Sequence, residues 1–386
     1  MEVLIMSLRR EKCTQKVIDA GLDGVLFATG ANFQYLSECT DYFWQRACMN
    51  NIGGSFSAKL LPETLAYLNN KGECTIVTIP QYKDAFPGQK VVVSYMDQFE
   101  DTLSTIIDGK KIGIGNDCKD FVIETLKEVD PEISTEDVEF IFCDLMAIKD
   151  EEEIAQMRKL AKFTDDAIMY VVTHLKEGMT QYEAEKMIMD YGLEHGIQDL
   201  SFPPTAGFKT RGTFTPEENF IFPRTSKLVP GTAIAFDVGY MDKGYCSDWG
   251  RTVYYGKAPE YVKNAYKALQ AGQVYMVSKI VPNETKASDL YKYILEEVTR
   301  QGFDEVLRYK DTQMNGHQIG IDCHNHPLLK KEVDDILRPG MIFCSEPKMM
   351  IEGECYMRVE DMILVTETGA EFLTNFPRDL FEFNND

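Results

Sequence analysis

Two apolar runs that each carry one aspartate constrain the fold of this chain more than any other feature. Residues 233–239 read AIAFDVG and residues 244–253 read GYCSDWGRTV, with a polar turn between them. Apolar runs on either side of a glycine-containing turn predict a β-hairpin. Asp237 and Asp248 then lie on opposite arms, where a buried carboxylate is costly unless a cation or hydrogen-bond donors neutralise it. Either one aspartate caps the turn while the other pairs with Arg251, or both bind a cation.

Histidines gather in a second segment. Three of the five histidines lie in residues 315–327, which read NGHQIGIDCHNHP. A single histidine is usually structural, but His317, His324 and His326 beside glycine and proline indicate a site. We expect Cys323 to be a packing thiol that faces away from this site.

Two glutamates stand at the ends of apolar, strand-like runs. Glu346 follows GMIFCS at residues 340–345, and Glu360 precedes DMILV at residues 361–365. Alone, either could be an ordinary surface carboxylate. With Asp237, Asp248 and His317 they form a set of four carboxylates and one imidazole, all in or beside apolar strands.

This set of side chains suits two divalent cations about 3.5 Å apart that share carboxylate ligands. Its oxygen-rich character favours Mn²⁺, Co²⁺, Fe²⁺ or Zn²⁺ over a thiolate-type site. A cation pair lowers the pKa of a bridging water and polarises a carbonyl group, which is the chemistry that amide hydrolysis requires.

The length of 386 residues predicts two domains, because one hydrophobic core rarely serves so long a chain. Short apolar runs separated by helical stretches predict a small α/β domain first. The acidic sequence KDEEEI at residues 149–154 favours the start of a long helix, and the chain is rich in strand signals from about residue 200. We therefore expect an α/β domain at residues 1–146 and an α+β domain at residues 147–386.

Composition limits the kinds of molecule that this protein can bind and the cell compartment in which we expect it. The net charge of −22 argues against nucleic acid and against an anionic membrane surface. No segment approaches the roughly 18 apolar residues of a membrane helix, and residues 1–10 lack the apolar core of a signal peptide. Ten cysteines without a C-x-x-C pair are typical of reduced thiols, so we expect a cytoplasmic protein.

The ordered motifs resemble those of the pita-bread metallopeptidase family, which includes methionine aminopeptidase, aminopeptidase P, prolidase and creatinase. The hairpin matches D-x-G and S-D-x-x-R-T, and residues 316–327 match G-H-x-x-G-x-x-x-H-x-x-P. Residues 345–347 match S-E-P, and residues 358–361 match R-V-E-D. The resemblance implies a creatinase/prolidase-like domain at residues 1–146 and a pita-bread catalytic domain at residues 147–386.

The resemblance also implies a metal centre with two divalent ions, of which Mn²⁺ is the most favoured and Co²⁺, Fe²⁺ or Zn²⁺ are alternatives. The implied ligands are Asp237, Asp248, His317, Glu346 and Glu360. Asp237 would hold one ion, His317 and Glu346 would hold the other, and Asp248 and Glu360 would bridge them. A homodimer is implied as well.

The catalytic roles implied by the resemblance fall on His324 and Glu346. His324 would bind substrate or stabilise the tetrahedral intermediate, and Glu346 would also carry the proton. Arg358 resembles a residue near the substrate pocket, with an ion pair that holds Glu360 or Asp248 in place as the alternative.

The residues expected around the substrate depart from the family pattern. Peptidases of this family usually carry a histidine 17 residues before the first ligand aspartate, and here that substrate-binding position is Phe220. The usual His-Glu-x-Pro begins His324-Asn325 here, and Glu-Pro-Gly ends in Lys348. The metal ligands thus match the family while the substrate surroundings differ.

Three functions remain open. The first is a dinuclear metal-dependent hydrolase of small peptides or amides, similar to Xaa-Pro dipeptidase or aminopeptidase, with metal-activated water as nucleophile. The second is a creatinase-like C–N hydrolase or lyase that acts on a non-peptide metabolite. The third is a non-catalytic, peptide-binding pita-bread protein, which the retention of all five ligands disfavours.

Overall fold

The computed structural model describes residues 7–40, 64–95, 98–115, 118, 120–215, 218 and 221–384, so Phe220 lies outside the described residues. The chain divides into two compact units, Met1–Met146 and Ala147–Asp386. None of the helices in these described ranges is long and apolar enough to cross a membrane.

The first unit is a mixed β-sheet with helices. Its sheet has the strand order β4-β3-β2-β1-β5-β6. The strands are β1 (Gly24–Ala28), β2 (Thr64–Asn69), β3 (Cys74–Thr78), β4 (Lys90–Val93), β5 (Lys111–Ile114) and β6 (Ser134–Asp137). The helices are α1 (Leu8–Asp19), α2 (Ala31–Ser37), η2 (Pro80–Tyr82), α3 (Phe99–Ile106), α4 (Asp120–Val129) and α5 (Cys143–Ala147), which spans the border.

The core of the first unit lies around β1, whose residues are all buried. This strand pairs with β2 in antiparallel and with β5 in parallel orientation. Side chains of α3 and α4, among them Leu103 and Val122, pack onto Leu26 and Leu65 of the sheet. The predicted α/β domain is therefore present.

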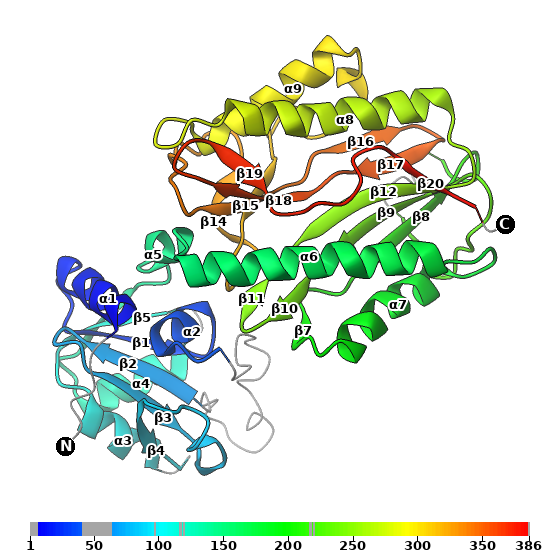
Figure 1. The fold of residues 1–386 in the computed structure, drawn as a ribbon. Coiled ribbons are helices and arrows are strands. Elements are labelled where there is room, and N and C mark those ends of the chain that lie inside the picture. Colours follow the sequence, from blue (N-terminus) through cyan, green and yellow to red (C-terminus); the bar gives the residue numbers. More distant parts are fainter. Residues whose placement is uncertain are drawn as a thin grey trace. The chain divides into compact units, whose positions relative to one another are not determined.

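The second unit holds its strands between two pairs of helices (Figure 1). Its helices are α6 (Glu151–His174), α7 (Gln181–Glu194), α8 (Glu260–Lys279), η5 (Ala287–Asp289), α9 (Leu290–Arg300) and η6 (Asp304–Val306). Its first strands are β7 (Asp199–Leu200), β8 (Thr205–Thr210), β9 (Thr232–Val238), β10 (Tyr240–Asp242), β11 (Tyr245–Cys246) and β12 (Trp249–Tyr255). They are followed by β13 (Gly316–Gln318), β14 (Asn325–Leu329), β15 (Ile342–Ser345), β16 (Lys348–Ile351), β17 (Cys355–Arg358), β18 (Asp361–Val365), β19 (Ala370–Phe372) and β20 (Phe381–Phe383).

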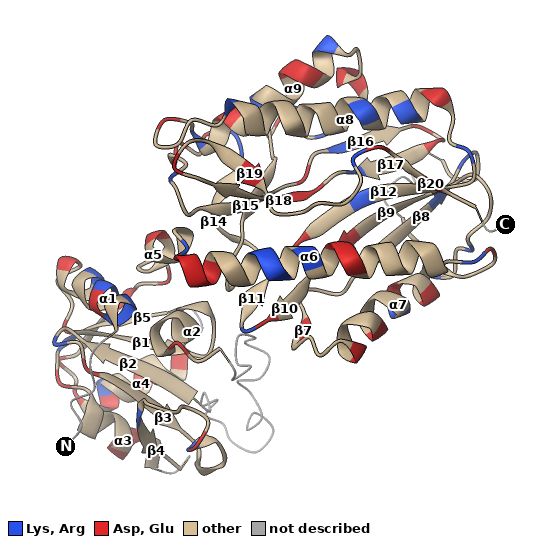
Figure 2. Ribbon diagram, in the orientation of Figure 1, with Lys and Arg blue, Asp and Glu red and all other residues tan. Residues whose placement is uncertain are grey.

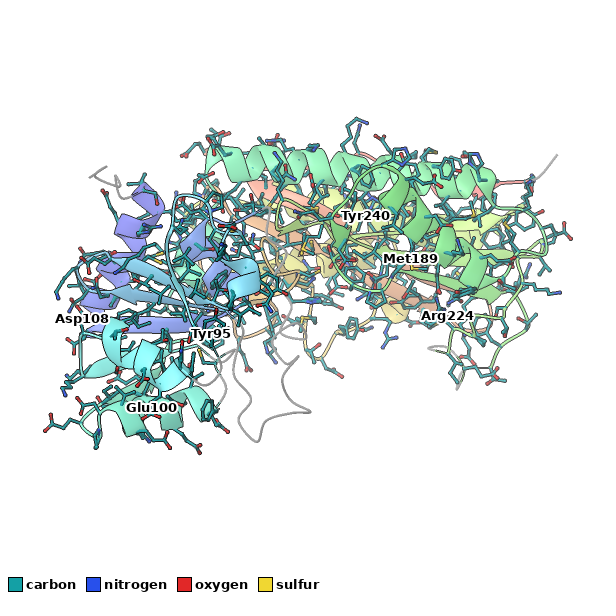
Figure 3. The ribbon with its side chains drawn as sticks, turned by 90° about the horizontal axis from the view of Figure 1, so that it is seen from below. Tyr95, Glu100, Asp108, Met189, Arg224 and Tyr240 are labelled. Atoms are coloured by element: carbon teal, nitrogen blue, oxygen red, sulfur yellow. The ribbon has the colours of Figure 1, made fainter. Side chains whose placement is uncertain are left out.

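Two sheets form the centre of this unit. One has the order β20-β12-β9-β8 and packs its apolar side chains against α6 and α7. The other has the order β14-β13-β15-β18-β19 and packs against α8 and α9. Tyr240, labelled in Figure 3, is buried beneath α7 and donates its hydroxyl to the carbonyl oxygen of Ile188 at 2.8 Å.

Local sequence explains where the first two helices of this unit begin. Asp150 accepts backbone N–H groups of α6 while the Glu153 carboxylate accepts the N–H of Asp150, and Thr180 and Glu183 do the same for α7. Such capping boxes satisfy N–H groups that a helix start leaves unpaired. The capping box expected at residues 180–183 is confirmed.

The predicted hairpin is confirmed and has an added feature. Strands β9 and β12 pair antiparallel, with Asp237 opposite Gly250. Between them, β10 and β11 form a smaller hairpin that pairs with β7 in another sheet. Lys243 and Gly244 both have positive φ, as a two-residue turn of type I′ requires.

Charge is concentrated on the helices of the second unit (Figure 2). Strands β9 and β12 each carry a single charged residue, Asp237 and Arg251. A charged side chain on a buried strand needs a charged or polar partner, so Asp237 and Arg251 indicate that polar groups lie inside this unit.

Candidate metal centre

All five predicted ligands lie within the second unit, in or directly beside strands. Asp237 is on β9, Asp248 precedes β12, His317 is on β13, Glu346 follows β15 and Glu360 precedes β18. Asp248, His317 and Glu360 are 3%, 2% and 1% exposed. The two sheets thus bring together residues that lie up to 123 positions apart, the separation from Asp237 to Glu360 (360 − 237).

A bridge between the two sheets places Glu360 next to the hairpin. The Glu360 N–H donates to the carbonyl oxygen of Gly250 at 2.7 Å, and residues 250 and 360 form an isolated β-bridge. A Cβ atom at residue 250 would lie 2.5 Å from Cδ of Arg358 and 2.9 Å from Cβ of Glu360. Only glycine therefore permits this approach without displacement of its neighbours.

Asp248, His317 and Glu360 converge with Cys344, and the candidate ligand atoms of these four residues all lie within 4.8 Å of one another. The Nε2 atom of His317 is 3.4 Å from Oδ2 of Asp248. Its Nδ1 atom is 3.0 Å from the Gln318 carbonyl oxygen, which can only accept a hydrogen bond. A proton therefore belongs on Nδ1, and Nε2 faces a carboxylate oxygen. Burial acts to lower the pKa of His317, but Asp248 raises it and so favours a second proton on Nε2, and a shared cation would take the place of that proton.

The orphaned oxygen of Asp248 supports the same interpretation. Within the part of the chain that the structure describes, Oδ1 of Asp248 is buried and has no hydrogen-bond partner. Burial, reinforced by Asp248 and Glu346, raises the pKa of Glu360 well above its usual value. A buried carboxylate oxygen without a donor and a neighbouring carboxyl group that resists ionisation both gain from a divalent cation, so the residues fit the predicted group.

Asp237 and Glu346 meet two basic side chains. Arg358 forms ion pairs with Asp237, with Glu346 at 3.6 Å and with Glu360 at 3.2 Å, and Lys348 pairs with Glu346. Burial raises the pKa of Asp237 to about 6 even though Arg358 opposes the shift. Burial also acts to raise the pKa of Glu346, but Lys348 and Arg358 outweigh it and lower the pKa.

The contacts of Arg358 decide between its two predicted roles only in part. The ion-pair alternative is confirmed for Glu360, whereas for Asp248 the structure gives no ion pair with Arg358 among the described residues. The substrate-binding role of Arg358 stays a prediction.

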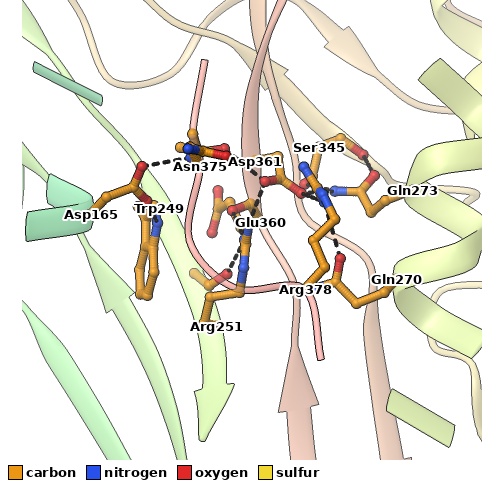
Figure 4. A network of polar contacts seen from close by, with 12 residues as sticks. Asp165, Trp249, Arg251, Gln270, Gln273, Ser345, Glu360, Asp361, Asn375 and Arg378 are labelled. Carbon is orange, nitrogen blue, oxygen red and sulfur yellow. Dashed lines mark hydrogen bonds and ion pairs between the residues drawn. The ribbon is translucent and has the colours of Figure 1, made fainter. Parts of the chain in front are cut away.

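A buried polar network lies behind Glu360 (Figure 4). Arg251 is fully buried, donates to the backbone oxygens of Gly250 and Glu360, and pairs with Asp361. Asp361 also accepts from Thr374 at 2.7 Å. The alternative in which Arg251 pairs with an aspartate of the hairpin is therefore wrong: Arg251 points across to the other sheet and fixes the backbone of Glu360.

The histidine segment divides into an inner and an outer part. The rings of His317 and His324 are 4.0 Å apart between centroids, so His324 lies beside the centre, and it is exposed. Burial and the neighbouring His317 lower the pKa of His324. His326 instead lies 3.5 Å from Asp335, outside the group of ligands.

The prediction that Cys323 faces away is wrong. Its Sγ atom donates to Oδ2 of Asp248 at 3.3 Å. The pairing of β13 with β14 shifts register after His317, and residues 320–324 form bends instead of a strand. Alternation of faces therefore does not apply to Cys323.

Sequence reasoning also missed Cys344 and the position of Lys348 beside Glu346. In extended chain, residues two apart point to the same side. The spacing of 344, 346 and 348 therefore carried the signal that could have found both.

Comparisons with known proteins agree with this geometry. The model of metallopeptidase family M24 matches residues 155–367. An uncharacterized peptidase of Staphylococcus aureus (strain USA300) is 27% identical over 242 residues, which is 63% of this chain and 66% of that protein. An uncharacterized peptidase of Staphylococcus epidermidis is 27% identical over 260 residues, 67% of this chain and 69% of its own length. The chain thus spans about two thirds of the length of these relatives.

Solved structures share the fold. A dipeptidase from Pyrococcus horikoshii OT3 has a TM-score of 0.81 at 22% identity, covering 97% of this chain and 100% of that one. A prolidase from Thermococcus sibiricus has a TM-score of 0.81 at 25% identity, with 98% and 99% covered. An Xaa-Pro dipeptidase from Bacillus anthracis has a TM-score of 0.79 at 21% identity, with 97% and 99% covered. The predicted fold class, an α/β N-terminal domain plus an α+β pita-bread C-terminal domain, is confirmed.

Proposed function

Because this chain belongs to metallopeptidase family M24, we propose that it is a dinuclear metal-dependent hydrolase of small peptides or amides, similar to Xaa-Pro dipeptidases. One observation carries the proposal. Asp248, His317 and Glu360 converge in the protein interior, and Oδ1 of Asp248 is buried without a partner among the described residues.

We propose a specific role for each of the candidate ligands and for the residues that position them. Two divalent cations, Mn²⁺ before Co²⁺, Fe²⁺ or Zn²⁺, would be held by Asp237, Asp248, His317, Glu346 and Glu360. When bound, such ions supply a water of lowered pKa and polarise the scissile carbonyl. Gln318 fixes the His317 imidazole through its backbone oxygen, and Arg251 fixes the backbone of Glu360.

Glu346 is proposed to move the proton. Lys348 and Arg358 keep its carboxylate ionised, so it can accept a proton from the attacking water and return it to the leaving amine. His324 is proposed to bind the substrate carbonyl, because its exposed ring lies against His317. Arg358 is proposed to position Asp237 and to contact an anionic group of the substrate.

The remaining assignments are proposals of the same kind. We assign the chemistry to residues 147–386 and a creatinase/prolidase-like role to residues 1–146. The cysteines without a C-x-x-C pair support a cytoplasmic location, and the family supports a homodimer. The acidic composition argues against nucleic-acid and membrane partners. Phe220 is proposed to stand at the substrate position that is usually histidine, on sequence alone.

One observation favours the second candidate function, a C–N hydrolase or lyase of a non-peptide metabolite. Lys348 stands where the family pattern has glycine, and its ammonium group pairs with Glu346 inside the centre. A charged side chain at this place changes what the site accepts. The substrate therefore needs a direct test with both classes of compound.

The test combines metal content with substrate profiling. Mass spectrometry of the purified protein should find about two divalent ions per chain, and Mn²⁺ should support cleavage of a panel of Xaa-Pro dipeptides. Two ions without cleavage would favour the non-peptide substrate. Failure to bind metal under any loading condition would contradict the proposal and favour the peptide-binding function.

A further inference from the structure

A second group of possible ligands lies next to the proposed centre. Ligand atoms of Asp248, Cys323 and His324 all lie within 4.8 Å of one another. Cys323 is half-buried and His324 is exposed, so the group opens toward solvent while Asp248 is buried. It shares only Asp248 with the five predicted ligands.

The distance between the thiol and the carboxylate is close to the separation of two ligands on one tetrahedral Zn²⁺ ion. Zinc bonds of about 2.3 Å to sulfur and about 2.1 Å to oxygen place the two donors about 3.6 Å apart in a tetrahedron. The Sγ atom of Cys323 is 3.3 Å from Oδ2 of Asp248, which differs by a few tenths of an ångström. Thiolate and imidazole together select Zn²⁺ over Mn²⁺, which prefers oxygen ligands.

The Asp248 carboxylate has lone pairs beyond those that would bridge the two ions of the five-ligand centre. Its Oδ2 atom contacts both Cys323 and His317, while Oδ1 is buried without a hydrogen-bond partner in the described ranges. A carboxylate offers about four lone-pair sites, so Asp248 could bridge the two ions of the five-ligand centre and still present a lone pair of Oδ2 to a cation beside Cys323.

We propose that Asp248, Cys323 and His324 bind a Zn²⁺ ion at a position additional to the five-ligand centre. On binding, the sulfur lone pair forms the Zn–S bond and the thiol proton passes to solvent, so no oxidant or reductant is needed. Because His324 would then be a ligand, it could not contact a substrate carbonyl. Zinc at this position therefore inhibits hydrolysis, a consequence that rests on the proposed function.

The test measures the ligands of zinc without a contribution from manganese. Full-length protein loaded with Mn²⁺ receives one equivalent of Zn²⁺, and X-ray absorption at the zinc edge reports the ligands of zinc. We expect a Zn–S distance of about 2.3 Å in the parent protein. The sulfur signal should be lost in Cys323→Ser and retained in Cys344→Ser. It should also be retained in Cys143→Ser, a matched control because Cys143 is half-buried and lies on α5.

A measurement on the parent protein tests the proposal without depending on whether the variants fold. Zn²⁺ should protect Cys323 from alkylation, read by mass spectrometry of the peptide that contains it, while Mn²⁺ should not. In activity assays, Cys323→Ser should raise the zinc concentration for half-inhibition at least about tenfold, the lower end of what loss of a ligand's hydrogen-bond partner costs in metal affinity.

The outcomes separate this inference from the proposed function. A zinc spectrum without a Zn–S signal in the parent protein would overturn the zinc site, even if Mn²⁺ supports cleavage. A Zn–S signal that persists in Cys323→Ser would overturn it as well. A Zn–S bond that depends on Cys323 would establish the site even if no peptide is cleaved.

Discussion

Lys348 and Arg358 set the charge balance among the predicted carboxylate ligands. The two bases pair with Asp237, Glu346 and Glu360. If two divalent cations balance the four carboxylates of the ligand set, the charges of Lys348 and Arg358 are left for another anion. At the scale of single residues, this favours a substrate that carries a free carboxylate close to the scissile bond.

Lys348→Met should therefore weaken hydrolysis of dipeptides more than hydrolysis of their C-terminal amides. A charge-assisted hydrogen bond contributes about 1.5–3 kcal/mol, which corresponds to roughly 10- to 150-fold in kcat/KM. Steady-state kinetics on matched free-acid and amide substrates measure the difference. Lys331→Met at an exposed position is the control, and equal losses for acid and amide would refute the carboxylate role.

Asp237 makes metal binding depend on pH. Burial raises its pKa to about 6, and a proton competes with a cation for the same oxygens. Protonation increases as the pH falls through about 6, so the affinity for Mn²⁺ should fall steeply there and level off above it. Calorimetric titrations on both sides of this pH test the sign, and affinity that does not change through the range would contradict it.

At the scale of elements, the proposed centre depends on the contact between two sheets. Each sheet is supported by its own pair of helices. The bridge from Gly250 to Glu360 is one point where they touch, and the ion pair from Arg251 to Asp361 is another. The proposed ligand positions thus lie in strands or directly beside them, and such positions are stiffer than loops and can hold metal ligands to within fractions of an ångström.

Gly250→Ala should loosen this contact. The new methyl group would lie within 3.0 Å of both Arg358 and Glu360, and overpacking of this kind costs about 1–3 kcal/mol. Denaturant unfolding and metal titration should both show the loss. Gly369→Ala is the control, because its Cβ would meet its nearest neighbour at 3.9 Å.

Asp361→Asn should destabilise the unit by about 3–5 kcal/mol, because it leaves the charge of Arg251 buried without its carboxylate partner. Arg158→Ala breaks an exposed ion pair with Glu371, in which each side chain is 45% exposed, and should cost less than about 1 kcal/mol. Chemical denaturation compares the two variants. Similar losses would mean that the buried network contributes little.

The sequence predicted elements whose causes are local. The β9–β12 hairpin follows from apolar runs around a Lys243-Gly244 turn, and the start of α7 follows from Thr180 and Glu183. The candidate ligand residues were chosen from ordered motifs, and the structure brings Asp248, His317 and Glu360 of that set together. The orientation of Cys323 could not be predicted, because it depends on a register shift between strands.

Partners that are distant in sequence were likewise beyond local patterns. Arg251 lies 110 positions from Asp361, and nothing near residue 251 distinguishes this carboxylate from Asp237 or Asp248 as a partner. Only the packing of one sheet against the other selects it. Buried polar pairs between sheets are therefore what sequence reasoning is least able to assign.

At the scale of the whole molecule, the proposed metal centre lies in a unit that has its own hydrophobic core. The proposed ligands, Arg358 and the network behind Glu360 all belong to residues 147–386, which have core clusters of their own. Residues 1–146 are built around a different core.

A fragment of residues 147–386 should therefore fold and bind the same number of metal ions per chain as the full protein, with affinity within about tenfold. Its helix α6 keeps the capping box that Asp150 provides. Metal analysis and circular dichroism check this expectation. A folded fragment that binds no metal would show that the centre needs residues of the first unit.

The ion pairs of Arg358 bear on the order of events when this protein is made in a cell. Because the chain supplies an internal counter-ion to three of the proposed acidic ligands, we expect that folding does not wait for a metal. The ions can arrive after synthesis is complete and displace contacts that already hold the side chains in place. Which metal the enzyme carries would then depend on the supply that the finished protein meets, and a change of growth medium could alter it without any change in the gene.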